Sequence, residues 1–225
     1  MKYKLMSYKL RYGMPSWPNA DKIITEQKAF IPQGSPCNEW TYHIRNHVGT
    51  HMDGPNHFCN DGKKIGDLPM ERFIYEKPFV LDIPKGEYEK IWKADLEPYA
   101  DKIAACDLLI FRTGQYKWHE TNVEAYENRG ASVSAEAAEY LVKNFPNLKS
   151  IMMDFVSLAN PGDTADGNVA HRWLLGMWTD NFIGIIEDAD LSDVDADGLK
   201  MVIGLPLIIE NVDSCQEIGR ASCRE

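Results

Sequence analysis

The sequence lacks the features that mark membrane, secreted and disulfide-stabilised proteins. No apolar run in its 225 residues is long enough to cross a bilayer, and residues 1–10 alternate polar and apolar side chains where a signal peptide has an unbroken apolar core. Cysteine is scarce: the five that occur are an odd number and form no C-x-x-C pair, which suits a reducing compartment better than a disulfide scaffold. We therefore expect a cytoplasmic protein that has no membrane partner.

Blocks of basic residues are missing as well. The chain has 24 Lys and Arg residues against 34 Asp and Glu residues, a formal net charge of -10, and neither sign is gathered into a long run. Because phosphate binding needs clustered Lys and Arg, we do not expect nucleic acid as a partner.

Short apolar runs alternate with helix-like stretches, and this alternation predicts one mixed α/β domain with a substantial core. A helix is expected to begin after Ser134, a good N-cap residue, and to stop before Pro146. A second helix is expected near Asp95. The expected strands comprise residues 3–10, 39–46, 79–83, 108–112, 150–153, 182–186 and 201–209.

The last nine residues, 217–225, follow an apolar run abruptly and resemble the translation of a common sequencing adapter. We interpret them as a non-native tail and place the domain at residues 1–216. A native end replaced in this way would weaken an edge strand or a subunit contact.

Four of the six histidines lie between positions 43 and 57, and three of them share one pattern with an aspartate. A turn at Gly49 would fold His47 back towards His51, and an extended chain would place His51 and Asp53 on the same face. Two imidazoles and a carboxylate suit zinc, manganese or iron and leave a position open for water. Any single histidine is more simply explained by packing, but the combination indicates a metal site.

The segment H-x-G-T-H-x-D-x-P-x-H-F, residues 47–58, resembles the signature of the metal-dependent cyclase-like hydrolase family, which includes bacterial kynurenine formamidase and isatin hydrolase. The resemblance covers nearly the whole chain, with supporting matches at residues 13–18, 109–114 and 151–154. It implies a swivelling β/β/α fold that assembles as a homo-oligomer, a dimer or a tetramer.

The resemblance also implies two later ligands, His171 and Glu187. Sixteen residues separate them, more than the formamidase branch leads us to expect, so an insertion around residues 177–181 is predicted and Asp180 and Asp188 are alternatives to Glu187. Without the resemblance, His171 would be interpreted as a helix histidine.

A complete site would hold two divalent ions, both zinc, with manganese as another choice. His47, His51 and Asp53 would bind the first ion; Asp53, His171 and Glu187 would bind the second, with Asp53 bridging them. Such ions lower the pKa of a bound water towards ~7, so that the water can attack a carbonyl group.

His57 is the residue that we predict to act as general base and then general acid, because an imidazole titrates near neutral pH. Trp17 matches a substrate-contacting aromatic residue of the family, although a buried loop anchor is an equal alternative. The expected reaction is cleavage of an amide bond in a small aromatic or cyclic substrate, with N-formylkynurenine as the leading candidate. Ring-opening of a cyclic amide or lactone, and a non-catalytic metal-dependent binding protein, are the alternatives.

Overall fold

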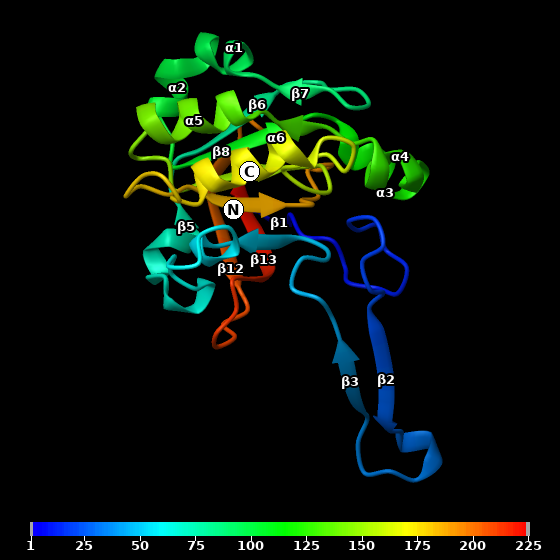
Figure 1. The fold of residues 1–225 in the computed structure, drawn as a ribbon. Coiled ribbons are helices and arrows are strands. Elements are labelled where there is room, and N and C mark those ends of the chain that lie inside the picture. Colours follow the sequence, from blue (N-terminus) through cyan, green and yellow to red (C-terminus); the bar gives the residue numbers. More distant parts are fainter. Residues whose placement is uncertain (1, 224–225) are drawn as a thin grey trace.

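Nine strands form the central sheet of the protein, which we describe from a computed structural model over residues 2–223 (Figure 1). The sheet has the order β5-β12-β13-β4-β11-β10-β8-β6, and β1 pairs with β13 outside this path. Its strands are β1 (Lys2–Leu5), β4 (His51–Asp53), β5 (Ile74–Tyr75), β6 (Pro78–Asp82), β8 (Leu108–Arg112), β10 (Ser150–Met153), β11 (Gly184–Glu187), β12 (Leu199–Pro206) and β13 (Ser214–Cys223).

The strands β6, β8, β10 and β11 are parallel to one another, whereas β4 runs antiparallel to both β11 and β13. Strands buried on both faces need apolar residues at every position. The β8 sequence Leu-Leu-Ile-Phe meets this need, with Leu109 and Phe111 in one core cluster and Leu108 and Ile110 in the other. This explains why β8 and β10 occupy the predicted residues.

Helices cover one face of the parallel strands (Figure 1). Ser134 caps the helix that was expected to begin after it by accepting a hydrogen bond from the Ala137 amide, 3.1 Å away. The α-helices are α1 (Lys93–Leu96), α2 (Ala100–Ala105), α3 (Trp118–Thr121), α4 (Val123–Asn128), α5 (Ala135–Asn144) and α6 (Thr164–Leu174). The 3-10 helices are η1 (Ile31–Gln33), η2 (Pro55–His57), η3 (Ile65–Asp67), η4 (Met70–Phe73), η5 (Glu97–Tyr99) and η6 (Gln115–Lys117). Among the described residues, no helix has the length and apolar character needed to cross a membrane.

Two further pairs of strands lie outside the central sheet. The short strands β7 (Lys90–Ile91) and β9 (Ser132–Val133) are parallel. The strands β2 (Ile24–Ala29) and β3 (Glu39–His43) form an antiparallel hairpin that projects from the body, and we call it the arm (Figure 1). The arm is exposed on both of its faces.

The mixed α/β class is confirmed, and the differences from the expected elements are strand ends and whole elements that were not expected, among them β2 and β13. The first strand stops at Leu5, the arm strand β3 at His43 and β12 at Pro206, each three to five residues before the expected end. Residues 217–223 continue β13, paired with β12 and β1. The interpretation of residues 217–225 as a non-native tail stays a prediction.

Candidate metal centre

Strand β4 places two of the predicted ligands on one face of the sheet. Because side chains alternate along a strand, His51 and Asp53 point to the face opposite Met52, which is buried in the core beneath. The antiparallel register sets Glu187 of β11 directly across from His51. Three ligand-type side chains from two distant segments therefore meet at one place.

The residues that flank β4 turn back to the same place. Gly49 has a φ of 70°, a left-handed conformation that glycine adopts without strain, and the predicted turn is confirmed there. The turn brings His47 Nδ1 to 3.0 Å from Asp53 Oδ1. After β4, helix η2 carries His57, whose Nε2 lies 3.9 Å from Asp53 Oδ2.

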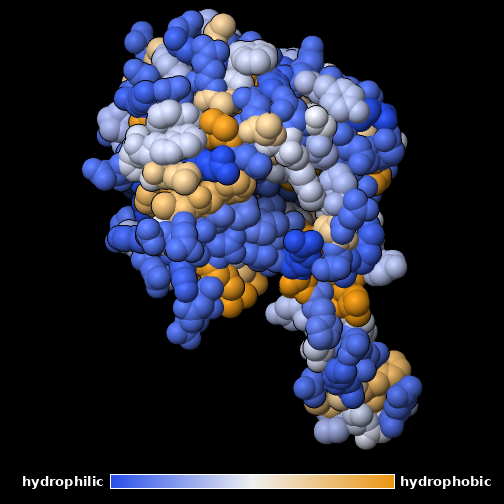
Figure 2. Space-filling model, viewed as in Figure 1, coloured by the Kyte–Doolittle hydropathy of each residue, from blue (hydrophilic) through white to orange (hydrophobic). Residues whose placement is uncertain are grey.

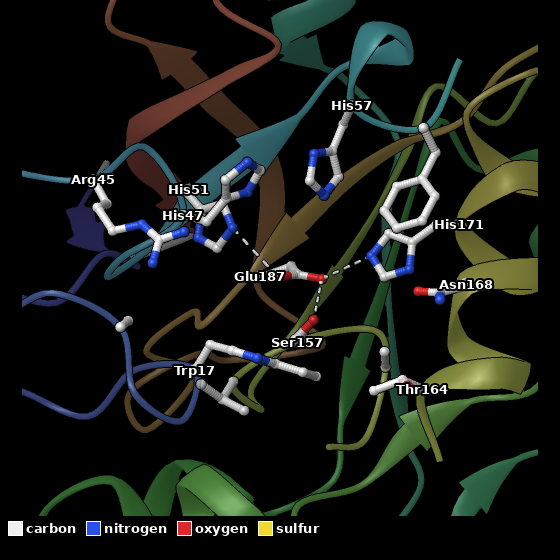
Figure 3. Close-up of a pocket in the computed structure, with 14 residues that line it drawn as sticks. Trp17, Arg45, His47, His51, His57, Ser157, Thr164, Asn168, His171 and Glu187 are labelled. Carbon is white, nitrogen blue, oxygen red and sulfur yellow. Dashed lines mark hydrogen bonds and ion pairs between the residues drawn. The ribbon is translucent and has the colours of Figure 1, made fainter. Parts of the chain in front are cut away.

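Helix α6 supplies the remaining histidine from above the sheet. His171 Nε2 lies 3.6 Å from Glu187 Oε1 (Figure 3). The same nitrogen lies 4.0 Å from Asp53 Oδ2. The helix approaches closely because Gly167 faces Ala159: a Cβ at position 167 would lie 2.2 Å from the Ala159 Cβ. All six predicted metal and catalytic residues are therefore brought together around Asp53 and Glu187.

Backbone carbonyl groups orient two of these histidines. His51 Nδ1 lies 2.7 Å from the Gly49 carbonyl oxygen, and His171 Nδ1 lies 2.8 Å from that of Gly167. A carbonyl oxygen only accepts hydrogen bonds, so each Nδ1 carries a proton. The Nε2 atoms of both rings face the carboxylates, as ligand atoms held by an outer hydrogen bond do in metal sites.

The buried polar atoms at the centre could be satisfied by a cation. Both Asp53 carboxylate oxygens and His51 Nε2 have no hydrogen-bond partner among the described residues, although all three are buried. Two groups of atoms lie within 4.8 Å of one another and could hold an ion: His47, Asp53 and His57, and His51, Asp53 and Glu187. The predicted sets were His47, His51 and Asp53 for one ion, and Asp53, His171 and Glu187 for the other. In the structure, His57 takes the place of His51 in the first set, and His51 takes the place of His171 in the second.

Electrostatics favour positive charge at the same centre. Burial would lower the pKa of His47, but its contacts with Asp213 and Asp53 raise it to about 10. Burial would raise the pKa of Glu187, yet the neighbouring His171 and His51 hold it well below its ordinary value. The carboxylates thus stay ionised and attract either protons or a divalent cation.

Glu187, and not its two alternatives, faces the centre. Its Oε1 also accepts hydrogen bonds from Ser157 Oγ at 3.0 Å and the Leu158 amide at 2.6 Å. Asp188 turns away with a φ of 54° and accepts a hydrogen bond from the Tyr126 hydroxyl at 2.6 Å. Asp180 is exposed in the loop that joins α6 to β11, where the insertion was predicted.

The histidines and Glu187 open into a cavity of about 230 Å³. Its walls include Trp17, Phe58 and Arg45, and Figure 3 shows the Trp17 indole on the opposite side of the cavity from His57. Phe58 stacks on His171 with ring centroids 4.5 Å apart. The cavity therefore has aromatic walls, a cationic residue and a polar centre, as small-molecule sites commonly have.

Asp213 is the residue that the sequence reasoning missed. It lies between β12 and β13, and its Oδ2 is 2.7 Å from His57 Nδ1 and 3.0 Å from His47 Nε2. Hydrogen bonds to these histidines hold its pKa below the ordinary value, although burial alone would raise it. One acidic residue among 34, far from the histidine motif, carries no spacing signal that could have identified it.

A comparison with protein families agrees with this arrangement. The model of the Cyclase family, described as "Putative cyclase", matches residues 5–160 of the chain. The chain belongs to the Cyclase family. The family resemblance of the histidine segment is thereby confirmed.

Relatives of this Cyclase family member include an uncharacterized protein of Haemophilus influenzae, 40% identical over 121 residues, which are 54% of this chain and 85% of that protein. The kynurenine formamidase of Erythrobacter litoralis is 29% identical over 220 residues, 98% of this chain and 92% of that enzyme. The solved structure of isatin hydrolase A from Labrenzia aggregata is similar, with a TM-score of 0.83 at 18% identity and coverage of 100% and 94%. This likeness confirms the cyclase-like fold.

Proposed function

We propose that the protein is a metal-dependent hydrolase that cleaves an amide bond of a small aromatic substrate, in the manner of an arylformamidase. The observation that carries the proposal is the buried cluster of histidines and carboxylates, with orphaned Asp53 oxygens, at one side of a cavity lined by Trp17 and Phe58. The similarity to a kynurenine formamidase over 98% of this chain supports a formamide as substrate.

The residues fit a divalent cation, zinc first and manganese second, because imidazole and carboxylate ligands suit both. We assign His47, His51, Asp53, His171 and Glu187 to two such ions. When bound, the ions polarise the substrate carbonyl and make water acidic enough to attack at neutral pH.

His57 performs the proton transfers in this proposal. Its Nε2 faces the centre of the site, while its Nδ1 is held by Asp213. His57 takes the proton of the attacking water and delivers it to the amide nitrogen as the C–N bond breaks, so that N-formylkynurenine and water give kynurenine and formate. The Trp17 indole would stack on the substrate ring.

Arg45 favours a substrate that has a carboxylate. Its side chain lines the cavity, and Figure 3 shows it beside His47. N-formylkynurenine has an amino-acid carboxylate that a guanidinium can bind in a bidentate manner, whereas isatin and simple lactones have none.

The experiment is an assay of zinc-loaded protein with N-formylkynurenine, neutral formanilide, isatin and a simple lactone. We expect turnover of N-formylkynurenine, and we expect Arg45→Ala to raise its KM while the KM for formanilide stays unchanged. Turnover of isatin or the lactone alone would favour a ring-opening hydrolase. Stoichiometric metal binding without turnover of any of the four would favour a binding protein.

We also propose that two or more copies of the chain assemble through the arm. An isolated two-stranded hairpin is marginally stable in water, yet the arm stands out from the body of the molecule (Figure 2). It exposes Trp40 by 55% and Tyr42 by 65%. Packing against a second copy would bury these aromatic residues. Light scattering should give the mass of a dimer or tetramer, and Trp40→Ser with Tyr42→Ser should give a monomer; a monomeric wild type would contradict the proposal.

A further inference from the structure

One carboxylate oxygen contacts two of the site histidines. Asp213 Oδ2 lies 2.7 Å from His57 Nδ1 and 3.0 Å from His47 Nε2. The other oxygen, Oδ1, accepts a hydrogen bond from Asn46 Nδ2 at 2.7 Å, and the Asp213 backbone carbonyl accepts one from the Gly54 amide at 3.0 Å. The carboxylate is therefore held in place from both sides of β4.

An ionised carboxylate only accepts hydrogen bonds, so each nitrogen that faces it must carry a proton. His57 is thereby fixed with its proton on Nδ1, which leaves the Nε2 lone pair towards Asp53 Oδ2 and the cavity. His47 carries a proton on Nε2 towards Asp213, so Nδ1, which lies 3.0 Å from Asp53 Oδ1, is the atom that can give up its proton and bind an ion. These are the tautomers that a general base and a metal ligand need.

The nearby hydroxyl group of Ser214 cannot fix the tautomer of His47. Ser214 Oγ lies 3.0 Å from His47 Nε2 and 3.4 Å from His47 Nδ1. A hydroxyl both donates and accepts, so it is compatible with either tautomer. Asp53 also contacts both rings, but through separate oxygens and at 3.9 Å from His57, whereas a single Asp213 oxygen lies within hydrogen-bond distance of both.

We propose that Asp213 is a positioning residue that sets the tautomers of His47 and His57 together, so that a ligand and the proton-transfer base depend on a single carboxylate. The inference rests on the proposed function, because it gives His47 and His57 the roles described above. His51 and His171 differ from this pair, since backbone carbonyls orient them and no side-chain substitution removes those acceptors.

The test is long-range 1H–15N NMR of histidine-labelled protein, with and without zinc, together with zinc affinity by chelator competition. In the wild type we expect the His57 proton on Nδ1. Asp213→Asn should lose this preference, because its amide nitrogen donates, and should bind zinc 10- to 100-fold more weakly. Asp213→Glu should restore part of the zinc affinity.

Asp193→Asn is the matched control, because it removes an exposed carboxylate that pairs with Lys4 and does not line the cavity. It should leave tautomers and zinc affinity unchanged. Circular dichroism reports whether each variant is folded. If Asp213→Asn does not fold, the NMR spectrum of the wild type decides whether the His57 proton lies on Nδ1. A His57 proton on Nε2 in the wild type, or unchanged tautomers and zinc affinity in a folded Asp213→Asn, would overturn the inference.

None of these measurements needs a substrate. A wild type that binds zinc and has the expected tautomers but cleaves no amide would contradict the proposed function and leave the role of Asp213 intact. Amide cleavage by a protein whose tautomers do not depend on Asp213 would support the proposed function and contradict the role of Asp213.

Discussion

His51 lies directly across the sheet from Glu187, with its Nε2 3.3 Å from Glu187 Oε2. Register partners in an antiparallel pair point to the same face, so backbone hydrogen bonds set this distance. The pair is buried, and the opposite end of the His51 ring is held by the Gly49 carbonyl.

Removing the charge of Glu187 should release metal. Glu187→Gln keeps the size of the side chain but loses an anionic ligand, so we expect lower metal content per chain and weaker affinity, by 10-fold or more, measured by mass spectrometry of metals and chelator competition. Asp180→Asn, on the exposed loop before β11, is the control and should retain wild-type metal content. Loss of metal in Asp180→Asn with none in Glu187→Gln would reverse the assignment.

Replacing His57 should separate catalysis from metal binding. We expect His57→Ala to lower kcat by about 10²- to 10⁴-fold, the usual contribution of a general base, while metal content stays near that of the wild type. Metal analysis and steady-state kinetics give the two readouts. His43→Ala, on the exposed arm, should change neither. If His57→Ala loses metal along with activity, His57 is a ligand.

Gly49→Ala should damage the site through the backbone. Position 49 has a φ of 70°, and an added Cβ would lie 2.4 Å from Leu10 Cδ2. We expect a loss of stability of about 1–2 kcal/mol and weaker zinc binding, because the Gly49 carbonyl orients His51. Gly34→Ala has a φ of 90° but no atom near the new Cβ, so it should lose stability without losing zinc affinity. Equal zinc losses in both variants would contradict the prediction.

Glu217 should make the fold less stable as pH rises. Burial without a partner raises the pKa of its carboxyl from 4.5 to about 8. Between these two pH values the folded protein holds a proton that the unfolded chain has lost. This contribution to the free energy of unfolding is therefore complete below pH 4.5 and is lost as the pH rises to 8. The loss is on the order of 5 kcal/mol.

The measurement is urea unfolding between pH 5 and pH 8 for the wild type and Glu217→Gln. The wild type should lose more stability over this range than the variant, which has no proton to lose at this position. Parallel pH profiles would contradict the prediction.

The histidine segment was predictable because its signal is local. Period-two spacing placed His51 and Asp53 on one face, and Gly49 marked the turn, so the sequence identified one side of the site without the fold. His171 and Glu187 came only from the family resemblance, because His171 lies on a helix of mixed polarity and Glu187 ends an apolar strand, and neither pattern shows where these side chains point.

Two features could not be obtained from the sequence, for different reasons. Strand β4 has only three residues, too few for a periodic pattern, and Asp213 joins the site only through the pairing of β13 with β4. The arm strand containing Trp40 and Tyr42 was predicted from alternation, which indicates a strand but does not show whether one of its faces is buried in the same chain.

The position of β4 between β11 and β13 has a consequence for the time at which the site can form during synthesis. A ribosome makes His47, His51 and Asp53 long before β11 and β13, the only strands with which β4 pairs in the described part of the chain. Since chains emerge N-terminus first, the nascent histidine segment leaves the exit tunnel without its neighbours. We therefore expect metal to be acquired late, after β13 has been translated.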